Sequence, residues 1–335
     1  MNLHKKEHNV NLGLLTQLTQ AFGPSGYEDK VRALIQEHVA PWADELRTDP
    51  LGNLIAYHRG NGKGQKIVLA AHMDEIGVMV SHVDKEGYLR FTRIGGVYPL
   101  HCIGSRVRFA DGTHGVIYLE HREDTSPSPK LTQLYIDVGA TNKDDVPVSV
   151  GAPAVFVRPL VQQGERLISK ALDDRIGCYI LIELLQQVQD SPHDLYFLFS
   201  TQEEVGLRGA RTAAFSINPD MAIAVDVTIT GDTPKALPMA VTLGDGPAIK
   251  VQDSGMIAHP KVRQLLVDAA RKAKVPYQLE VLRGGTTDAA AMQLTRAGIP
   301  SGALSIPCRY IHSPSEMVDS EDVANAIKLL AAALA

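Results

Sequence analysis

Histidines and carboxylates follow several apolar segments of the chain, at positions that a folded sheet would bring together. They are His72 and Asp74 after KIVLAA, Asp173 and Asp174 before an expected helix, Glu203 and Glu204 after LYFLFSTQ, Asp226 at the end of MAIAVD, and His312 after the apolar segment 302–306. In open α/β sheets, ligands bind outside the carboxyl ends of the strands. Imidazole and carboxylate groups are suitable ligands for a divalent metal ion. The sequence therefore predicts a metal site at one edge of a sheet.

Each of these residues also has an ordinary structural explanation. A single His-x-Asp is usually a hydrogen-bonded loop pair, and Asp-Asp before a helix is most often an N-cap that pairs with a base such as Arg175. His312 alone would more often be a structural histidine. Clustered carboxylates, however, repel one another and are costly to desolvate unless a cation offsets their charge. The whole set therefore favours a metal site over surface chemistry.

The first half of the chain changes character near residue 75. Before that point, Ser25 and Glu28 have the spacing of a capping box and predict a helix that ends at Pro41, followed by strands at 53–58 and 66–71. Between about residues 75 and 165, short β-branched runs alternate with turns that contain Gly, Asp or Pro, which predicts a small all-β unit. The expected strands of this unit are 78–83, 88–94, 106–109, 115–119, 134–138 and 154–157.

After residue 166, helices and strands alternate again, which predicts a sheet covered on both faces. The expected helices are 175–189, 207–214, 259–273, 287–297 and 319–335, and the expected strands are 194–200, 221–227, 277–282 and 302–306. We expect an α/β fold with a mixed sheet sandwiched by helices and an inserted small all-β barrel. The predicted divisions are a first catalytic part at 1–74, the inserted domain at 75–165 and a second catalytic part at 166–335.

The composition excludes several classes of protein. The 335 residues are 44% hydrophobic and 21% charged, with a net charge of −5 and 5% aromatic residues, so we expect no nucleic-acid partner. No apolar run approaches the roughly 18 residues that cross a membrane, and residues 1–15 lack the apolar core of a signal peptide. Cys102, Cys178 and Cys308 are widely spaced and odd in number, which argues against a disulfide framework. We expect a cytoplasmic protein without a membrane partner.

Six strings resemble the tetrahedral, or glutamyl, aminopeptidase family of dinuclear-metal exopeptidases, some members of which are labelled cellulase or endoglucanase. They are HMDEIG (72–77), ALDDRIG (171–177), TQEEVGLRGA (201–210), DVTITGDTP (226–234), RGGTTDA (283–289) and RYIHSPSE (309–316). The resemblance extends from the N-terminal helices to near the C-terminus and includes the inserted β domain. It implies a zinc-exopeptidase-like fold.

The resemblance also implies a role for each site residue. Asp173 would bridge two ions, Glu204 and His312 would complete the site of one ion, and His72 and Asp226 would complete that of the other. Glu203 would be the general base, Asp74 would orient the imidazole of His72, and the Asp173–Asp174 peptide bond would be cis. Two ions about 3.5–4 Å apart can bind one water, lower its pKa and polarise a scissile carbonyl.

The implied activity is a metal-dependent aminopeptidase that acts on short peptides with a free N-terminus. We expect two zinc ions, with cobalt or manganese as alternatives, because nitrogen and oxygen ligands accept all three. The alternative is a glycoside hydrolase that uses Glu203 and Glu204, although sugar sites are usually lined by aromatic residues and Trp42 is the one tryptophan. A non-enzymatic metal-binding scaffold is disfavoured by the presence of Glu203, and a serine hydrolase by the lack of a G-x-S-x-G motif.

The predicted insert at 75–165 contains none of the five proposed ligands, so it needs another role. Short strands with exposed edges suit contact between subunits. The resemblance makes this role dimerisation, with dimers closing into a hollow dodecamer. The preferred N-terminal residue of the substrate is not indicated by the sequence.

Overall fold

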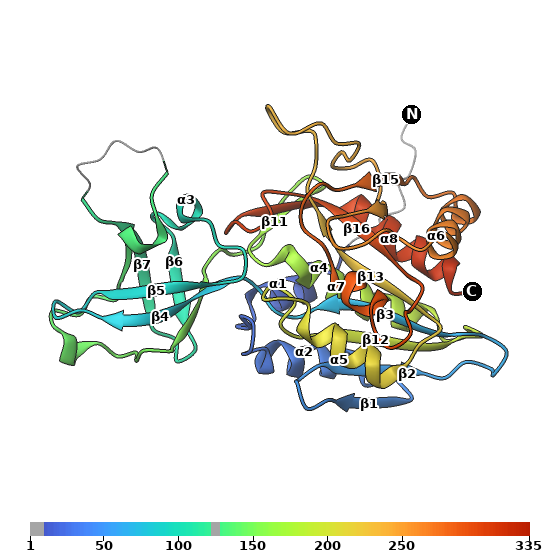
Figure 1. Ribbon diagram of the computed structural model, residues 1–335, viewed down its shortest axis with the longest axis horizontal. Coiled ribbons are helices and arrows are strands. Elements are labelled where there is room, and N and C mark those ends of the chain that lie inside the picture. The colour runs from blue at the N-terminus through green and yellow to red at the C-terminus, as the bar shows by residue number, and fades with distance from the viewer. Residues whose placement is uncertain (1–9, 122–127) are drawn as a thin grey trace.

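The computed structural model describes residues 10–121 and 128–335, which form an α/β domain with a smaller β-barrel beside it (Figure 1). The barrel is inserted between β3 (Lys66–His72) and β10 (Val161–Gln163) of the larger domain. This arrangement confirms the expected fold class, a mixed sheet sandwiched by helices with an inserted all-β barrel. The expectation about a signal peptide falls largely on residues 1–9, which lie outside the described residues. No helix in the described part of the chain is long and apolar enough to cross a membrane.

The central strands of the large sheet run parallel. They are β12 (Asp194–Ser200), β3, β13 (Met221–Thr228) and β16 (Ser301–Arg309). Antiparallel strands extend this centre on both sides. On one side they are β2 (Leu54–His58) and β1 (Glu45–Thr48), and on the other they are β17 (Glu316–Asp319), β11 (Arg166–Ser169) and β10. A further strand, β14 (Ala248–Gln252), pairs with both β16 and β15 (Gln278–Val281). The carboxyl ends of the four parallel strands therefore meet at one edge.

Helices cover both faces of this sheet because successive strand residues point to opposite sides. The helices of one face are α1 (Leu12–Gln20), α2 (Asp29–Val39), α4 (Leu172–Gln187), α6 (Pro260–Ala273) and α8 (Ser320–Ala333); those of the other are α5 (Arg208–Ile217) and α7 (Asp288–Gln293). In β3, Ile67 and Leu69 pack into the core of the first face, and Val68 and Ala70 pack into that of the second. Burial on both faces explains why this strand is a continuous apolar run.

The described strands of the insert close into an antiparallel barrel. In barrel order they are β4 (Gly77–Val83), β5 (Leu89–Ile94), β8 (Leu134–Asp137), β7 (His114–Leu119), β6 (Arg106–Phe109) and β9 (Pro153–Phe156). Phe91, Val107 and Ile136 lie in its own hydrophobic core. The short helix α3 (Pro99–Cys102) follows β5 on the side toward the α/β domain. Because the barrel closes, these strands offer no free edge, and the expectation of exposed edges is wrong.

Two further local expectations differ from the structure. Ser25 and Glu28 do not form a capping box, because the Ser25 hydroxyl donates to Asp74 Oδ2 at 2.6 Å and Glu28 Oε1 accepts the N–H groups of Gly26 and Gln202. The helix expected at 287–297 is shorter and ends at Gln293. Its N-cap is Thr287, whose side chain accepts the N–H of Ala289.

Candidate metal centre

The proposed ligands lie together where the parallel strands end. His72 is the last residue of β3, Glu204 follows β12, Asp226 lies near the end of β13, Asp173 stands at the start of α4, and His312 follows β16. These elements are far apart in the sequence, but the four strands are neighbours in the sheet and α4 packs against β3 and β13. The structure thus brings together all the residues that the sequence singled out as ligands.

Asp173 lies between the two histidines. Its Oδ1 is 3.0 Å from Nε2 of His72, and its Oδ2 is 3.3 Å from Nε2 of His312. Oε2 of Glu204 also lies 3.3 Å from Nε2 of His312. Beyond His72, Asp226 places Oδ1 at 3.9 Å from its Nε2. One carboxylate therefore faces two groups of ligands, one on either side.

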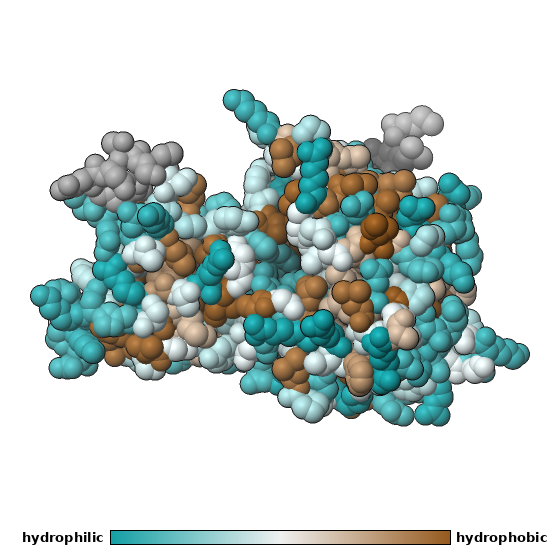
Figure 2. Space-filling model, viewed as in Figure 1, coloured by the Kyte–Doolittle hydropathy of each residue, from teal (hydrophilic) through white to brown (hydrophobic). Residues whose placement is uncertain are grey.

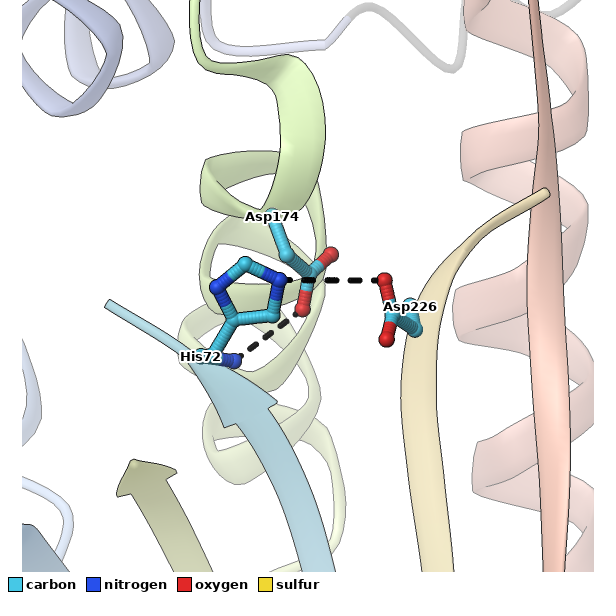
Figure 3. A group of neighbouring side chains, drawn as sticks. All are labelled: His72, Asp174 and Asp226. Atoms are coloured by element: carbon cyan, nitrogen blue, oxygen red, sulfur yellow. Dashed lines mark hydrogen bonds and ion pairs between the residues drawn. The ribbon is translucent and has the colours of Figure 1, made fainter. Parts of the chain in front are cut away.

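Asp174, the neighbour of Asp173, has its carboxylate close to His72 and Asp226 (Figure 3). Its oxygens, however, already accept backbone hydrogen bonds: Oδ2 accepts the N–H of His72 at 3.1 Å, and Oδ1 accepts that of Gly177 at 3.0 Å. The Asp173–Asp174 peptide bond is cis, as expected. Asp174 therefore anchors the end of β3 to α4, and Asp173 is the aspartate that faces both imidazoles.

Asp74 contacts His72 and the backbone of Glu203 and Glu204. Its Oδ1 lies 3.4 Å from Nδ1 of His72, on the side of the ring away from Asp173. The same carboxylate accepts the backbone N–H groups of Glu203 at 2.9 Å and Glu204 at 3.2 Å. The backbone carbonyl oxygen of Asp74 is also 3.1 Å from Nδ1 of His72. Asp74 can therefore fix the imidazole through its carbonyl and carboxylate oxygens, and the two glutamates through its carboxylate.

The amino-acid sequence of this chain is similar to those of known proteins. The profile of the M42 glutamyl aminopeptidase family matches residues 52–329. The chain is a member of the M42 family. It is 49% identical over 323 residues to a protein of Acetivibrio thermocellus named "Putative aminopeptidase", covering 96% of this chain and 97% of the relative. It is 39% identical to the lysyl aminopeptidase of Pyrococcus furiosus, covering 97% of each chain.

Solved structures of similar proteins share the whole architecture of this M42 chain. An aminopeptidase from Desulfurococcus kamchatkensis superposes with a TM-score of 0.93 at 43% identity, covering 96% of this chain and 94% of the other. The TET1 peptidase of Pyrococcus horikoshii, which can assemble into a tetrahedron or a large octahedral shell, gives 0.87 at 32% identity over 96% and 98%. A Thermotoga maritima structure described as an endoglucanase gives 0.81 at 35% identity over 96% of each.

The M42 chain also contains a supporting residue that the sequence analysis did not single out. Glu316, at the start of β17, is buried; its Oε2 accepts the N–H of Asp173 at 2.9 Å and its Oε1 accepts the N–H of His312 at 3.0 Å. It thus holds the backbone of two proposed ligands. Its place within RYIHSPSE, four residues after His312, was the available signal.

Arg175 is fully buried directly behind the site, and its partners differ from those expected. Its guanidinium donates mainly to backbone carbonyls, including Met73 at 2.6 Å, and lies 3.5 Å from Glu75 Oε1. Glu75 pairs more closely with Lys170, at 2.6 Å. Arg175 therefore ties α4 to the segment after β3, and the acid beside its guanidinium is Glu75 rather than Asp173 or Asp174.

The electrostatics of the site reflect crowded carboxylates. Burial raises the pKa of Asp226 to about 7. Burial opposes the charged form of His312, but hydrogen bonds to Asp173 and Glu204 outweigh this effect and raise the pKa of His312 to about 12. Burial also acts on Asp173, yet its contacts with His312 and His72 lower its pKa below the usual value. A bound cation would stabilise these carboxylates in the place of the protons.

The donor set fits a divalent metal ion. Ligand atoms of Asp173, Glu204 and His312 all lie within 4.8 Å of one another. Among the described residues, Glu204 Oε1 is one of few buried side-chain oxygens without a hydrogen-bond partner. A buried carboxylate oxygen left unpaired is costly, and coordination to a metal would satisfy it. The residues present therefore match the mixed nitrogen and oxygen ligands that zinc, cobalt and manganese accept.

A cavity of about 940 Å³ opens directly onto these residues. Residues of the α/β domain, such as Leu237, Met239 and Leu282, form an apolar part of its wall, and the barrel contributes Gly96 and Tyr98. The surface dips between the two parts of the molecule (Figure 2). The volume suits a ligand of the size of a short peptide.

Proposed function

We propose that this M42 chain uses two divalent metal ions and Glu203 to remove the N-terminal residue from short peptides. The family and its relatives named as aminopeptidases support the activity. The observation that carries the two-ion proposal is the position of Asp173, whose two oxygens face two different histidines. In this proposal His72 and Asp226 would hold one ion, Glu204 and His312 would hold the other, and Asp173 would serve as a ligand of both.

When bound, such ions supply Lewis-acid activation of a water molecule and of the scissile carbonyl, and zinc is the ion we expect, with cobalt or manganese as alternatives. Glu203 lies where it could accept the proton of the attacking water. Its Oε2 lies 3.8 Å from Nε2 of His72, at the wall of the cavity, and burial raises its pKa well above the usual range. A carboxylate of raised pKa can accept a proton from the attacking water and pass it to the departing amine.

The division of roles between Glu203 and Glu204 follows from their surroundings. Glu204 faces His312 at 3.3 Å, inside the group of ligands, and Glu203 stands beside His72 without a shorter contact to either histidine. Asp74 holds both backbone N–H groups, so the two side chains leave the same anchored segment. We assign the ligand role to Glu204 and the base role to Glu203.

A glycoside hydrolase is the less favoured candidate. Both glutamates point into a cluster that contains two imidazoles, whereas a glycosidase needs two carboxylates on opposite sides of a sugar ring. The word endoglucanase comes from the descriptions of similar structures, one of which reads peptidase/endoglucanase. Trp42, the one tryptophan of the chain, does not line the cavity.

We also propose that the chain forms a homo-oligomer, a dodecamer built from dimers, with the barrel as the dimerisation domain. The assembly described for the similar TET1 peptidase supports this proposal. A cytoplasmic location is part of the same proposal, because Cys102, Cys178 and Cys308 are free and buried thiols, as is usual in a reducing compartment.

The test of the activity is hydrolysis by metal-stripped and metal-reloaded protein. Aminoacyl p-nitroanilides with a free amine should be hydrolysed after zinc, cobalt or manganese is restored, and N-acetylated versions should not, because carboxylates and ions can bind an amino terminus but give no support to a blocked one. Cello-oligosaccharides should remain intact. Cleavage of N-acetylated substrates at an equal rate, or undiminished activity without metal, would contradict the proposal.

A further inference from the structure

The barrel reaches the candidate metal centre through the segment that follows β5. This segment comprises residues 95–101, which follow Ile94 and include the first turn of α3. Gly95, Gly96 and Tyr98 line the same cavity as the proposed ligands. The insert is therefore in contact with the site, although it contains none of the five ligands.

Gly96 lies against the ring of His312. A Cβ built on Gly96 would overlap Nδ1 of His312 and would lie 2.5 Å from its Cε1. The φ angle of Gly96 is not in the left-handed region, so the close approach of the imidazole, and not the backbone conformation, requires glycine here. The other ring nitrogen, Nε2, faces Asp173 and Glu204. Any larger residue at 96 must push the ring toward those carboxylates or turn it away from them.

The backbone of His312 is held by the same segment. Nδ1 of His101, in α3, lies 3.1 Å from the carbonyl oxygen of His312. Glu316 holds the other side through the N–H of His312. The φ of His312 is +60°, a conformation that non-glycine residues seldom adopt without support from their surroundings. The backbone of His312 is therefore held by the barrel segment through its carbonyl oxygen and by β17 through its N–H.

Gly95 contacts the second ligand of this group. A Cβ on Gly95 would lie 2.8 Å from Glu204 Oε2 and 3.0 Å from Glu204 Cβ. The two successive glycines thus let the barrel backbone approach both residues that, with Asp173, form one group of ligands.

We propose that the barrel segment from Gly95 to His101 is a positioning element of the metal centre, which fixes His312 and Glu204 for one of the two ions. The inference rests on the proposed two-ion function. It gives the insert a role within its own subunit, in addition to any role in assembly. Residues that orient metal ligands from outside the coordination sphere commonly contribute 10- to 100-fold to metal affinity.

The test is metal binding by Gly96→Ala, with Gly13→Ala as the matched control. Gly13 lies in α1, and its added methyl group would meet only Asn11 Oδ1, at 3.3 Å. Each variant is titrated with zinc by calorimetry, and the cobalt-loaded protein is examined by visible absorption spectroscopy. We expect Gly96→Ala to bind one of the two ions at least about tenfold more weakly, with an altered cobalt spectrum. Gly13→Ala should match the unmodified protein.

A second variant keeps the test decisive if Gly96→Ala does not fold. His101→Ala removes an exposed side chain and its contact with the His312 carbonyl, so the fold should persist, as circular dichroism would check. We expect a smaller loss of affinity for the same ion. Unchanged binding of both ions and an unchanged cobalt spectrum in the folded variants would overturn the inference. An unmodified protein that binds two ions but cleaves no peptide would instead overturn only the proposed function.

Discussion

Asp74 accepts the backbone N–H of Glu203 at 2.9 Å, so a fully buried carboxylate fixes the segment that carries the proposed general base. The same carboxylate lies 3.4 Å from Nδ1 of His72 and accepts the hydroxyl of Ser25 at 2.6 Å. One side chain therefore links the end of β3, the segment after β12 and the loop before α2. The position of the base and the orientation of a ligand therefore depend on the same residue, whose backbone carbonyl also lies 3.1 Å from Nδ1 of His72.

Asp74→Asn should lower kcat/KM by about 10- to 100-fold, with a loss of metal affinity of similar size. An amide has one acceptor oxygen and places an NH2 group where the carboxylate now accepts a backbone N–H, so the bonds to Glu203 and Glu204 cannot both persist. Steady-state kinetics and metal analysis after dialysis measure the two effects. Asp190→Asn, at an exposed position, is the control. Wild-type kinetics and metal content in Asp74→Asn would remove the positioning role.

Glu203→Gln should retain both ions and the fold but lower kcat by about 10²–10⁴-fold, the usual loss when a general base is removed. Glutamine keeps the size of the side chain but cannot accept the proton. Metal content is measured beside kcat, because a ligand mutation would lose metal as well. Glu37→Gln, on an exposed position of α2, tests the effect of the charge alone. Near-normal turnover at full metal occupancy would assign the base elsewhere.

The sequence could predict the proposed ligands because each follows an apolar strand or precedes a helix, and strand ends converge in a sheet of this kind. It could place Glu316 within RYIHSPSE but could not predict its contacts or the hydrogen bond of Ser25, because these groups act on backbone N–H groups or on a carboxylate that only the fold brings near. Ser25 in particular had the spacing of a helix cap, and its tertiary contact with Asp74 prevailed over that local signal.

The large sheet was predictable where its strands are buried on both faces, as in β3, and unpredictable at its edge. The strands β10, β11 and β17 have three or four residues each, too few to establish a period in the sequence. The glycines at 95 and 96 likewise carried no signal for the site, because the contacts of Gly96 with His312 depend on how the barrel packs against the α/β domain.

Metal binding should release protons, and its apparent affinity should rise with pH around neutrality. In the metal-free protein, hydrogen bonds to Asp173 and Glu204, against the effect of burial, raise the pKa of His312 to about 12, so this imidazole is charged and must lose a proton to become a ligand. Burial raises the pKa of Asp226 to about 7, which adds a partial proton near pH 7. Calorimetric zinc titrations at pH 7 in two buffers of different ionisation enthalpy should report at least about one proton released. Heats that do not depend on the buffer would contradict this prediction.

Substrates with a basic first residue should be poor. Apart from the proposed ligands and Glu203, the charged residues described as lining the cavity are Arg93, Arg283 and Lys250, beside an apolar wall. Lys250 is paired with Glu280 at 2.9 Å, so Arg93 and Arg283 are the two cations left to repel a basic substrate. Like charges in a partly enclosed site repel one another. We expect kcat/KM for leucine p-nitroanilide to exceed that for lysine p-nitroanilide by about tenfold or more, since each factor of ten corresponds to about 1.4 kcal/mol.

A charge-reversal variant at the cavity wall, with a matched variant outside the cavity, tests the role of charge. Arg283→Glu should raise the rate with the lysyl substrate relative to the leucyl substrate, and Arg47→Glu, on β1 and outside the cavity, should leave the ratio unchanged. A lysyl preference in the unmodified protein, as the name of the relative from Pyrococcus furiosus states for that enzyme, would contradict the prediction. If neither substrate is cleaved, the aminopeptidase proposal itself fails.

Assembly should depend on the outer face of the barrel, because the closed barrel leaves its described strands no free edge to pair. Tyr88, Val116 and Tyr118 are exposed there, and Tyr135 lies opposite Tyr118 on β8 with its ring 5.0 Å from that of Tyr88. Exposed aromatic clusters of this kind are common in protein interfaces. Twelve subunits of 36.3 kDa give about 436 kDa, and closed symmetry of this kind needs more than one interface.

Light scattering of the metal-loaded protein measures this mass directly. A mass near two subunits would contradict the dodecamer but not the dimer, and a mass near one subunit would contradict both. Tyr118→Asp should shift the protein toward smaller species, because it places a charge in an apolar contact that must be desolvated on association. Leu51→Asp, which introduces the same charge on the α/β domain, should leave the mass unchanged. If Tyr118→Asp retains the full mass, the dimer contact lies on a different surface.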